Sequence, residues 1–103
     1  MLDILTMESF SEQLNTKFRL YHNQGPEPVE MELISVTDLG STPRQAQFSC
    51  IFLAPHPAPV YQSIFRVEHE HLGPIELFLV PIGMDQQGVK LEAVFNRLKR
   101  ENR

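Results

Sequence analysis

Two histidines, His69 and His71, are the residues of this sequence whose type and spacing look most suited to chemistry. On a strand, side chains two positions apart point to the same side, so the two imidazoles could share a metal ion such as Zn²⁺. Such a site needs a third ligand, and the candidates His22, His56 and Glu68 are not at a spacing that supplies one. We therefore predict no metal site and no cofactor. One histidine should be hydrogen-bonded at a strand end and the other exposed at a turn.

Cys50 is the second candidate, because a thiolate paired with a histidine can act as a nucleophile. It lies between Ser49 and Ile51 in an apolar stretch, whereas a catalytic thiol needs an exposed, electropositive setting, so we expect it to pack in the core. As the single cysteine it cannot form an intramolecular disulfide, which fits a reducing compartment. The sequence also contains no Gly-rich phosphate loop, Gly-x-Ser-x-Gly elbow or Cys-x-x-Cys pair. We therefore expect a protein that is not an enzyme.

The length and composition predict one soluble globular domain that spans residues 1–103. The chain has 103 residues, of which 42% are apolar and 21% charged. It contains no apolar run of about 18 residues, the length needed to cross a membrane as a helix. Its first residues, Met-Leu-Asp-Ile-Leu-Thr, carry an acid where a signal peptide carries basic residues. We expect a cytoplasmic protein that is not exported and does not bind a membrane.

The charge is unevenly distributed along the chain. Residues 1–96 carry five basic and twelve acidic groups, a net charge of −7, whereas residues 97–103 carry four basic groups and one acidic group, a net charge of +3. An acidic body argues against a nucleic-acid-binding surface. The basic C-terminal tail, residues 97–103, is expected to be a solvated end that follows the last strand.

The second half of the chain has the pattern of a β-meander, with three extended segments separated by turns at 72–74 and 85–88. Glycines in both turns supply the positive φ that a tight reversal needs, and Asp85 can hydrogen-bond to its own backbone. The middle segment, residues 75–82, is apolar on both faces except for Glu76, so we expect it to be covered on both sides. Pro81 has no N–H to give a neighbouring strand and is expected at the end of this strand or at a bulge.

The first half of the chain predicts a helix over residues 7–14, capped by Thr6, and strands over 18–22, 29–39 and 47–53. The apolar pattern changes phase at Leu33-Ile34, which indicates a β-bulge. The predicted fold is therefore mainly β: an antiparallel six-stranded curled sheet, a small barrel or roll, with a short N-terminal helix. The interior of so small a barrel is filled by side chains, which argues against a ligand cavity.

The chain resembles an uncharacterised family of short bacterial proteins of about this length, one of the domain-of-unknown-function families. The resemblance covers nearly the whole chain and rests on these stretches: Leu5-Thr6 through Phe10, Val36-Thr37, Phe65-Arg66-Val67-Glu68-His69 with Leu72-Gly73, Leu77-Phe78-Leu79-Val80-Pro81-Ile82-Gly83, and Glu92-Ala93-Val94-Phe95-Asn96. Members of the family look similar to proteins encoded near phage-tail-collar-like genes. The resemblance therefore implies a role in assembling or serving a tail-like structure.

These observations favour a structural or protein-interaction module over an enzyme. Open sheet edges would let it pair strands with itself or with a partner, which predicts an oligomer or a copurifying protein. The alternative is a small-ligand or metal-binding β-barrel that uses His69 and His71 near the mouth of the roll. A hydrolase would need a triad that the sequence does not contain.

Overall fold

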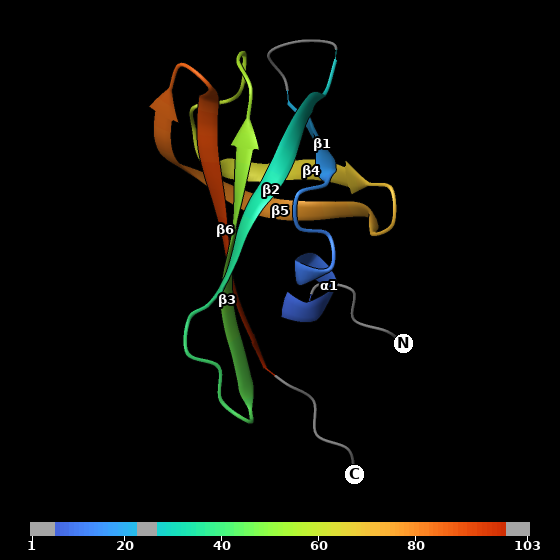
Figure 1. Ribbon diagram of the computed structural model, residues 1–103, viewed down its shortest axis with the longest axis vertical. Coiled ribbons are helices and arrows are strands. Elements are labelled where there is room, and N and C mark those ends of the chain that lie inside the picture. Colours follow the sequence, from blue (N-terminus) through green and yellow to red (C-terminus); the bar gives the residue numbers. More distant parts are fainter. Residues whose placement is uncertain (1–5, 23–26, 99–103) are drawn as a thin grey trace.

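The computed structural model describes residues 6–22 and 27–98, with side chains through Asn96. The elements in chain order are α1 (Met7–Ser11), β1 (Lys17–Tyr21), β2 (Val29–Asp38), β3 (Gln45–Ala54), β4 (Ser63–His69), β5 (Gly73–Asp85) and β6 (Gly88–Leu98). No helix in these two ranges is long and apolar enough to span a membrane. Figure 1 shows the strands wound around one another, with α1 beside the lower half of β2.

The six strands form one antiparallel sheet that closes on itself. Their hydrogen-bonded order is β1-β2-β3-β6-β5-β4, and β1 pairs with β4 to complete a closed barrel. The longest ladder joins β3 to β6 without a register shift, from Gln45 opposite Leu98 to Ala54 opposite Val89. The predicted fold class, an antiparallel six-stranded sheet with a short N-terminal helix, is confirmed. The pairing of β1 with β4 gives every strand two neighbours along at least part of its length.

β5 is the strand whose hydrogen-bonded partner changes along its length. Its residues up to Leu79 pair with β4, and its residues from Val80 pair with β6. The register with β6 shifts between Pro81 and Gly83, so the prediction of a bulge or strand end at Pro81 is confirmed. In Figure 1, β4 and the first part of β5 run across the view, while β2, β3 and β6 run along it. A bulge bends a strand and increases its twist, which allows β5 to pair first with β4 and then with β6.

A second bulge lies in β2, where the apolar pattern changes phase. The pairing of β2 with β3 shifts between Leu33 and Ser35, at the predicted position. Leu33 is buried before the shift, and Val36 packs against the core after it. The bulge thus lets one strand keep apolar side chains inside the barrel on both sides of the irregularity.

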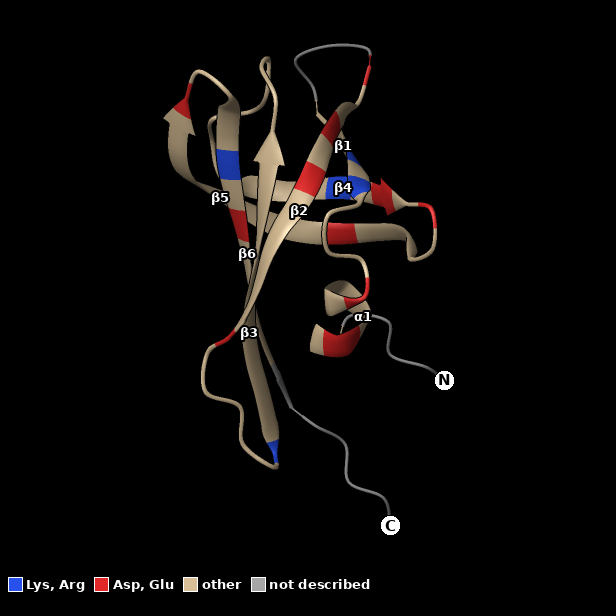
Figure 2. Cartoon of the chain, in the orientation of Figure 1, with Lys and Arg blue, Asp and Glu red and all other residues tan. Residues whose placement is uncertain are grey.

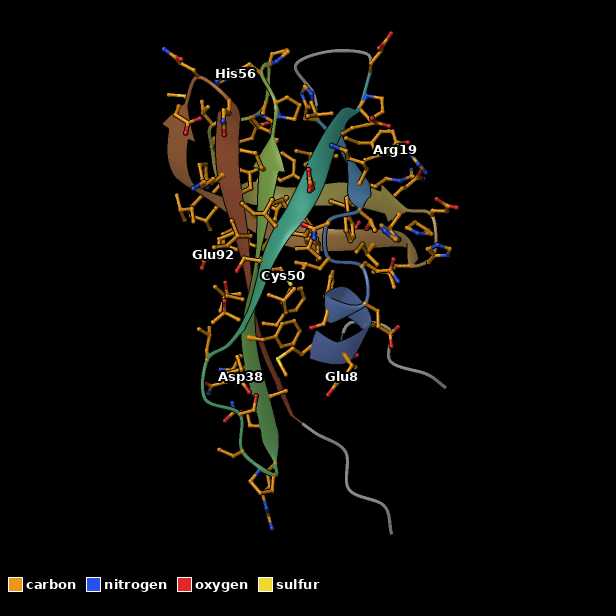
Figure 3. The ribbon with its side chains drawn as sticks, viewed as in Figure 1. Glu8, Arg19, Asp38, Cys50, His56 and Glu92 are labelled. Atoms are coloured by element: carbon orange, nitrogen blue, oxygen red, sulfur yellow. The ribbon has the colours of Figure 1, made fainter. Side chains whose placement is uncertain are left out.

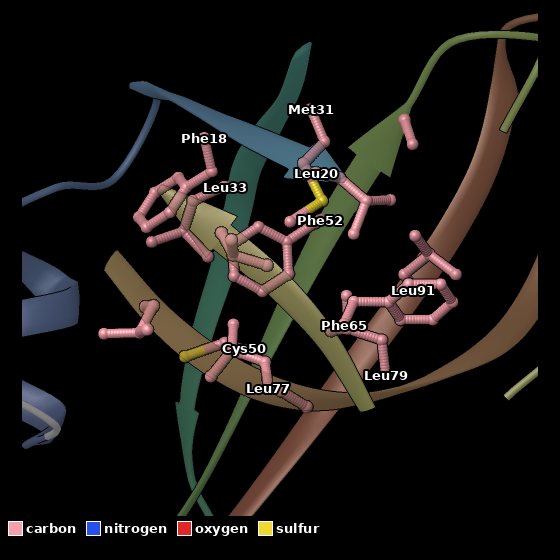
Figure 4. Close-up of a cluster of buried hydrophobic side chains, with 14 of the residues drawn as sticks. Phe18, Leu20, Met31, Leu33, Cys50, Phe52, Phe65, Leu77, Leu79 and Leu91 are labelled. Carbon is pink, nitrogen blue, oxygen red and sulfur yellow. The ribbon is translucent and has the colours of Figure 1, made fainter. Parts of the chain in front are cut away.

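The interior of the barrel is filled by side chains, as predicted. The inward residues of the six strands are apolar except for His69 at the end of β4, and Figure 4 shows part of the apolar cluster. The fully buried large side chains include Phe18, Leu20, Met31, Leu33, Phe48, Phe52, Leu79 and Leu91. Burial of one such side chain contributes about 1.5–3 kcal/mol to folding, so this cluster is the main source of stability.

Helix α1 closes one end of the barrel through Phe10. The Phe10 side chain is fully buried, and its ring lies 6.2 Å from that of Phe48 and 5.2 Å from that of Phe95. Thr6 caps the helix as predicted, because its hydroxyl accepts a hydrogen bond from the Ser9 N–H. The helix ends at Ser11 rather than at residue 14, and the chain turns toward β1. Leu14 therefore leaves the apolar stripe and is 42% exposed, contrary to the sequence prediction.

The prediction that the middle strand of the meander is covered on both sides is wrong. In β5 the residues Ile75, Leu77 and Leu79 face the core, but Phe78 is 52% exposed and Ile82 is 48% exposed. The reason is that the single described helix occupies the end of the barrel, against β2 and β3, and therefore does not form a layer over β5. An apolar outer face consequently remains on the surface.

Candidate functional site

His69, the first of the two candidate metal ligands, is buried at the end of β4 and ties three segments together. Its Nδ1 accepts hydrogen bonds from the backbone N–H groups of His71 (3.0 Å) and Leu72 (3.3 Å). Its Nε2 lies 2.8 Å from Oγ1 of Thr16, which donates to the carbonyl of Gln13 at 2.7 Å. His69 therefore joins the β4–β5 turn to the segment between α1 and β1.

This hydrogen-bond pattern fixes the protonation state of the imidazole. Because Nδ1 accepts from two N–H groups, it carries no proton, and the ring proton lies on Nε2, where it is donated to Thr16. Burial, followed by the proximity of His71, lowers the pKa of His69 below its ordinary value. Both nitrogens are thus engaged inside the protein. A metal ion could bind His69 only if one of these hydrogen bonds were broken.

The other candidate ligands do not gather around His69. The rings of His69 and His71 have centroids 5.7 Å apart, and His71 is exposed. His56 lies in the loop after β3, where its Nε2 is 2.8 Å from the carbonyl of Asp85 (Figure 3), and Glu68 binds arginines on the outer face. Within residues 6–22 and 27–98 no three histidine, cysteine, aspartate or glutamate side chains come close enough to hold a metal ion.

The neutral state of His69 predicts a pH dependence of stability. The pKa of His69 is lowered in the folded chain, so below about pH 6.5 the unfolded chain binds more protons, and stability falls with falling pH at up to about 1.4 kcal/mol per pH unit. Urea titrations between pH 7.5 and 5 should show this loss. The variant His69→Gln should be less stable at pH 7.5 and should lack the loss over this range. An equally steep loss in His69→Gln would contradict the assignment.

Cys50, the candidate nucleophile, lies in the core of the barrel (Figure 4). It faces inward in the middle of β3, opposite Val36 on one side and Ala93 on the other. Burial raises the pKa of its thiol to about 12, so the thiolate is not populated near neutral pH. The predicted packing position of Cys50 is confirmed.

The outer face of β1, β2 and β4 is charged and internally paired. Glu68 accepts hydrogen bonds from Arg66, Tyr21 and Arg19, and these contacts hold the pKa of its carboxyl below the ordinary value. Nζ of Lys17 lies 3.6 Å from Oε1 of Glu32, which is a further ion pair on this face. Figure 2 shows acidic residues on β2 and residues of both signs on β4. Such exposed pairs contribute little to stability, but they leave this face well solvated.

The outer face of β5 is different, because it is apolar. We define the β5 outer surface as Ile64, Phe78, Val80 and Ile82, of which Ile64 lies on β4 directly opposite Phe78. All of these residues except the half-buried Val80 are exposed. They stand on the side of the sheet away from the core, at alternate positions along β5. Sequence reasoning missed this surface because it treated a strand that is apolar on both faces as a strand buried on both faces.

A shallow pocket of about 310 Å³ lies between the end of β1 and the start of β4. Its lining includes Tyr21, Tyr61 and Arg66. The guanidinium of Arg66 lies 5.5 Å above the Tyr21 ring and also binds Glu68, so this cation already has partners. The pocket is open to solvent, and His22 and Ser63 also line it. The basic tail predicted for residues 97–103 lies outside the described side chains.

Comparison with known proteins places the chain beside one family. A family model described as "Domain of unknown function (DUF6916)" matches residues 5–95, which is most of the chain. No curated protein matches the chain, and no solved structure matches it.

Proposed function

We propose that this chain, which belongs to the family described as Domain of unknown function (DUF6916), is a protein-interaction module that binds a partner protein through the β5 outer surface. The observation that supports this most directly is the contrast between the two outer faces of the barrel. The face of β1, β2 and β4 carries ion pairs, whereas Ile64, Phe78 and Ile82 leave large apolar side chains in water. Clustered apolar residues on a protein surface are typical of a binding site.

The chemistry of the surface indicates the kind of partner. Phe78 is a residue type that is enriched at the centre of protein interfaces, because an aromatic side chain buries a large area and has only two side-chain torsions to fix. The body of the chain, residues 1–96, has a net charge of −7. We therefore expect a partner with an apolar patch and a basic surrounding surface, since opposite charges speed association and suppress wrong partners.

A tail-like assembly is the setting that we propose for this partner. The resemblance to proteins encoded near phage-tail-collar-like genes suggests it, and a small module with an apolar outer surface suits an accessory role in such an assembly. The His69 hydrogen bonds favour this interpretation over a metal-binding barrel, because both ring nitrogens are used within the protein.

The experiment is site-specific photo-cross-linking in the host cell. A photoreactive phenylalanine analogue replaces Phe78 in one variant and Glu30, an exposed residue on the charged face of β2, in the control. We expect a defined adduct with one protein from position 78 and none from position 30. Phe78→Ser, placed in the variant that carries the analogue at position 82, should abolish the adduct because it removes the largest apolar group of the surface.

Two outcomes would contradict the proposal. Equal adducts from positions 78 and 30 would show that contact at β5 is unspecific, and no adduct from position 78 or 82 would show that the surface has no protein partner. Native mass spectrometry of the untagged protein from its host tests the alternative. A bound small molecule or metal ion that disappears in the His69→Ala/His71→Ala variant would favour the ligand-binding function instead.

A further inference from the structure

The departure of β5 from β6 leaves part of β6 with one neighbour. β6 pairs with β5 only up to Glu92, opposite Val80, because β5 then crosses over to pair with β4. From residue 93 to 98, β6 continues to pair with β3 on its other side. None of the described residues pairs with this stretch on the side away from β3. We call the main chain of residues 93–98 on that side the β6 edge.

The direction of each backbone group along the β6 edge follows from the ladder. The Gln47 carbonyl accepts from the Leu39 N–H, so the backbone N–H and C=O of Gln47 point toward β2. Backbone groups alternate in direction along a strand. The N–H and C=O of Phe48 therefore point toward β6 and form a hydrogen-bonded pair with Phe95. The backbone groups of Val94 and Asn96 therefore point away from β3. Their N–H and C=O groups are the donors and acceptors of the β6 edge.

The β6 edge is less protected than the other two free edges. The free part of β5 begins with Gly73-Pro74, and by alternation from Val80 the missing N–H of Pro74 falls on its free side. The free part of β2 lies next to α1. Among the described residues, the β6 edge has no proline, α1 reaches it through the ring contact of Phe10 with Phe95, and Val94 on its outer face is 61% exposed. Natural proteins usually block such an edge, because it is a template for another strand.

We propose that the β6 edge pairs antiparallel with the β6 edge of a second copy of this chain, around a twofold axis at Phe95. In this register Val94 lies opposite Asn96 of the second copy, and about four main-chain hydrogen bonds join the two strands. The sheets β2-β3-β6 of the two copies then become one continuous sheet. This interface is separate from the β5 outer surface and does not depend on the proposed function.

The aromatic residues beside the edge support a second copy as the occupant. Phe95 stacks on Phe48 with ring centroids 4.6 Å apart and contacts Phe10, yet it remains only half-buried. In an antiparallel pair around Phe95, the two Phe95 residues are directly opposite on the same face, with Cβ atoms about 5 Å apart. Each ring would cover the exposed part of the other, so the edge is self-complementary in side chains as well as in hydrogen bonds.

The test combines a proline substitution with amide hydrogen exchange. Val94→Pro removes an N–H from the β6 edge but none from the β3 ladder, and a strand accepts proline where its N–H faces outward. We expect the wild-type chain to be a dimer in sedimentation equilibrium, and Val94→Pro to raise the dissociation constant about tenfold or more, since each dimer loses two hydrogen bonds. The control Val94→Thr keeps the N–H and the β-branched shape and should remain dimeric.

Hydrogen exchange on the wild-type chain needs no substitution and covers the case in which Val94→Pro does not fold. On dilution to monomer, the amides of Val94 and Asn96 should exchange roughly tenfold faster, while those of Ala93 and Phe95 stay protected by β3. A monomeric wild-type chain at millimolar concentration, or a folded Val94→Pro that dimerises as well as wild type, would overturn the proposal. Phe78→Ser should leave the dimer intact, so failure here is distinguishable from failure of the β5 partner surface.

Discussion

Replacing Gly88 with alanine should destabilise this protein by about 3–5 kcal/mol, one of the largest effects expected of any single methyl group in the chain. Gly88 begins β6 with φ at +148°, a conformation that L side chains rarely adopt. A Cβ at this position would also overlap the carbonyl oxygen of Ala54, the last residue of β3. That carbonyl cannot move freely, because Ala54 pairs with Val89 at the end of the long β3–β6 ladder. To make room for the Cβ, the β5–β6 turn would have to move away from the end of the β3–β6 ladder.

Urea unfolding followed by circular dichroism measures this effect, and Gly83→Ala is the matched control. Gly83 lies on the same hairpin, but its φ is not positive, and a Cβ there would meet no atom within 4 Å. We expect Gly83→Ala to change the free energy of unfolding by less than about 1 kcal/mol. Similar losses in the two variants would show that the close approach of Gly88 to Ala54 does not constrain the fold.

Replacing Phe10 with alanine should cost about 3–5 kcal/mol, because it removes a fully buried aromatic ring and leaves a cavity at the end of the barrel. Phe10 is the side chain through which α1 reaches the core. Its ring contacts Phe18 from β1, Phe48 from β3 and Phe95 from β6. Without the ring, a helix of only five residues has too few other buried contacts to stay folded.

The control for this substitution is Leu14→Ala, which removes the apolar side chain four positions after Phe10 in the sequence. Leu14 is 42% exposed, so its loss should cost less than about 1 kcal/mol. The free energies of unfolding from urea titrations decide between the two. If Phe10→Ala lowers the free energy of unfolding no more than Leu14→Ala does, then the packing of α1 on the end of the barrel does not contribute to stability.

Local features of the strands were predictable because each has a signature within a few residues. The change of phase at Leu33-Ile34 indicated the bulge in β2, and Pro81 indicated the shift in β5. The turn at Asp85 formed as expected, since its carboxylate accepts from the Gln87 N–H at 2.8 Å. The inward position of Cys50 followed from its apolar neighbours. In each case the physical cause is local: backbone conformation, alternation or hydrogen bonding within one turn.

The candidate sites were predictable only in part. The sequence indicated that one histidine would be hydrogen-bonded at a strand end, and His69 is so placed. Its partner Thr16 lies 53 residues away, and nothing in the spacing of the sequence connects the two. The β5 outer surface could not be recognised either, because an apolar residue such as Phe78 gives the same pattern whether another layer covers it or not.

The sequence by itself thus determined the number and type of the elements, the inward residues of most strands, and the positions of bulges and turns. The tertiary structure alone decided three things: that β1 pairs with β4 to close the barrel, that α1 ends at Ser11 and covers an end rather than a face, and that β5 leaves β6 at Val80. The reason is that pairing and covering are contacts between segments far apart in the chain, whereas alternation and turn chemistry are written within each segment. The apolar outer face of β5 and the free edge of β6 both result from those distant contacts.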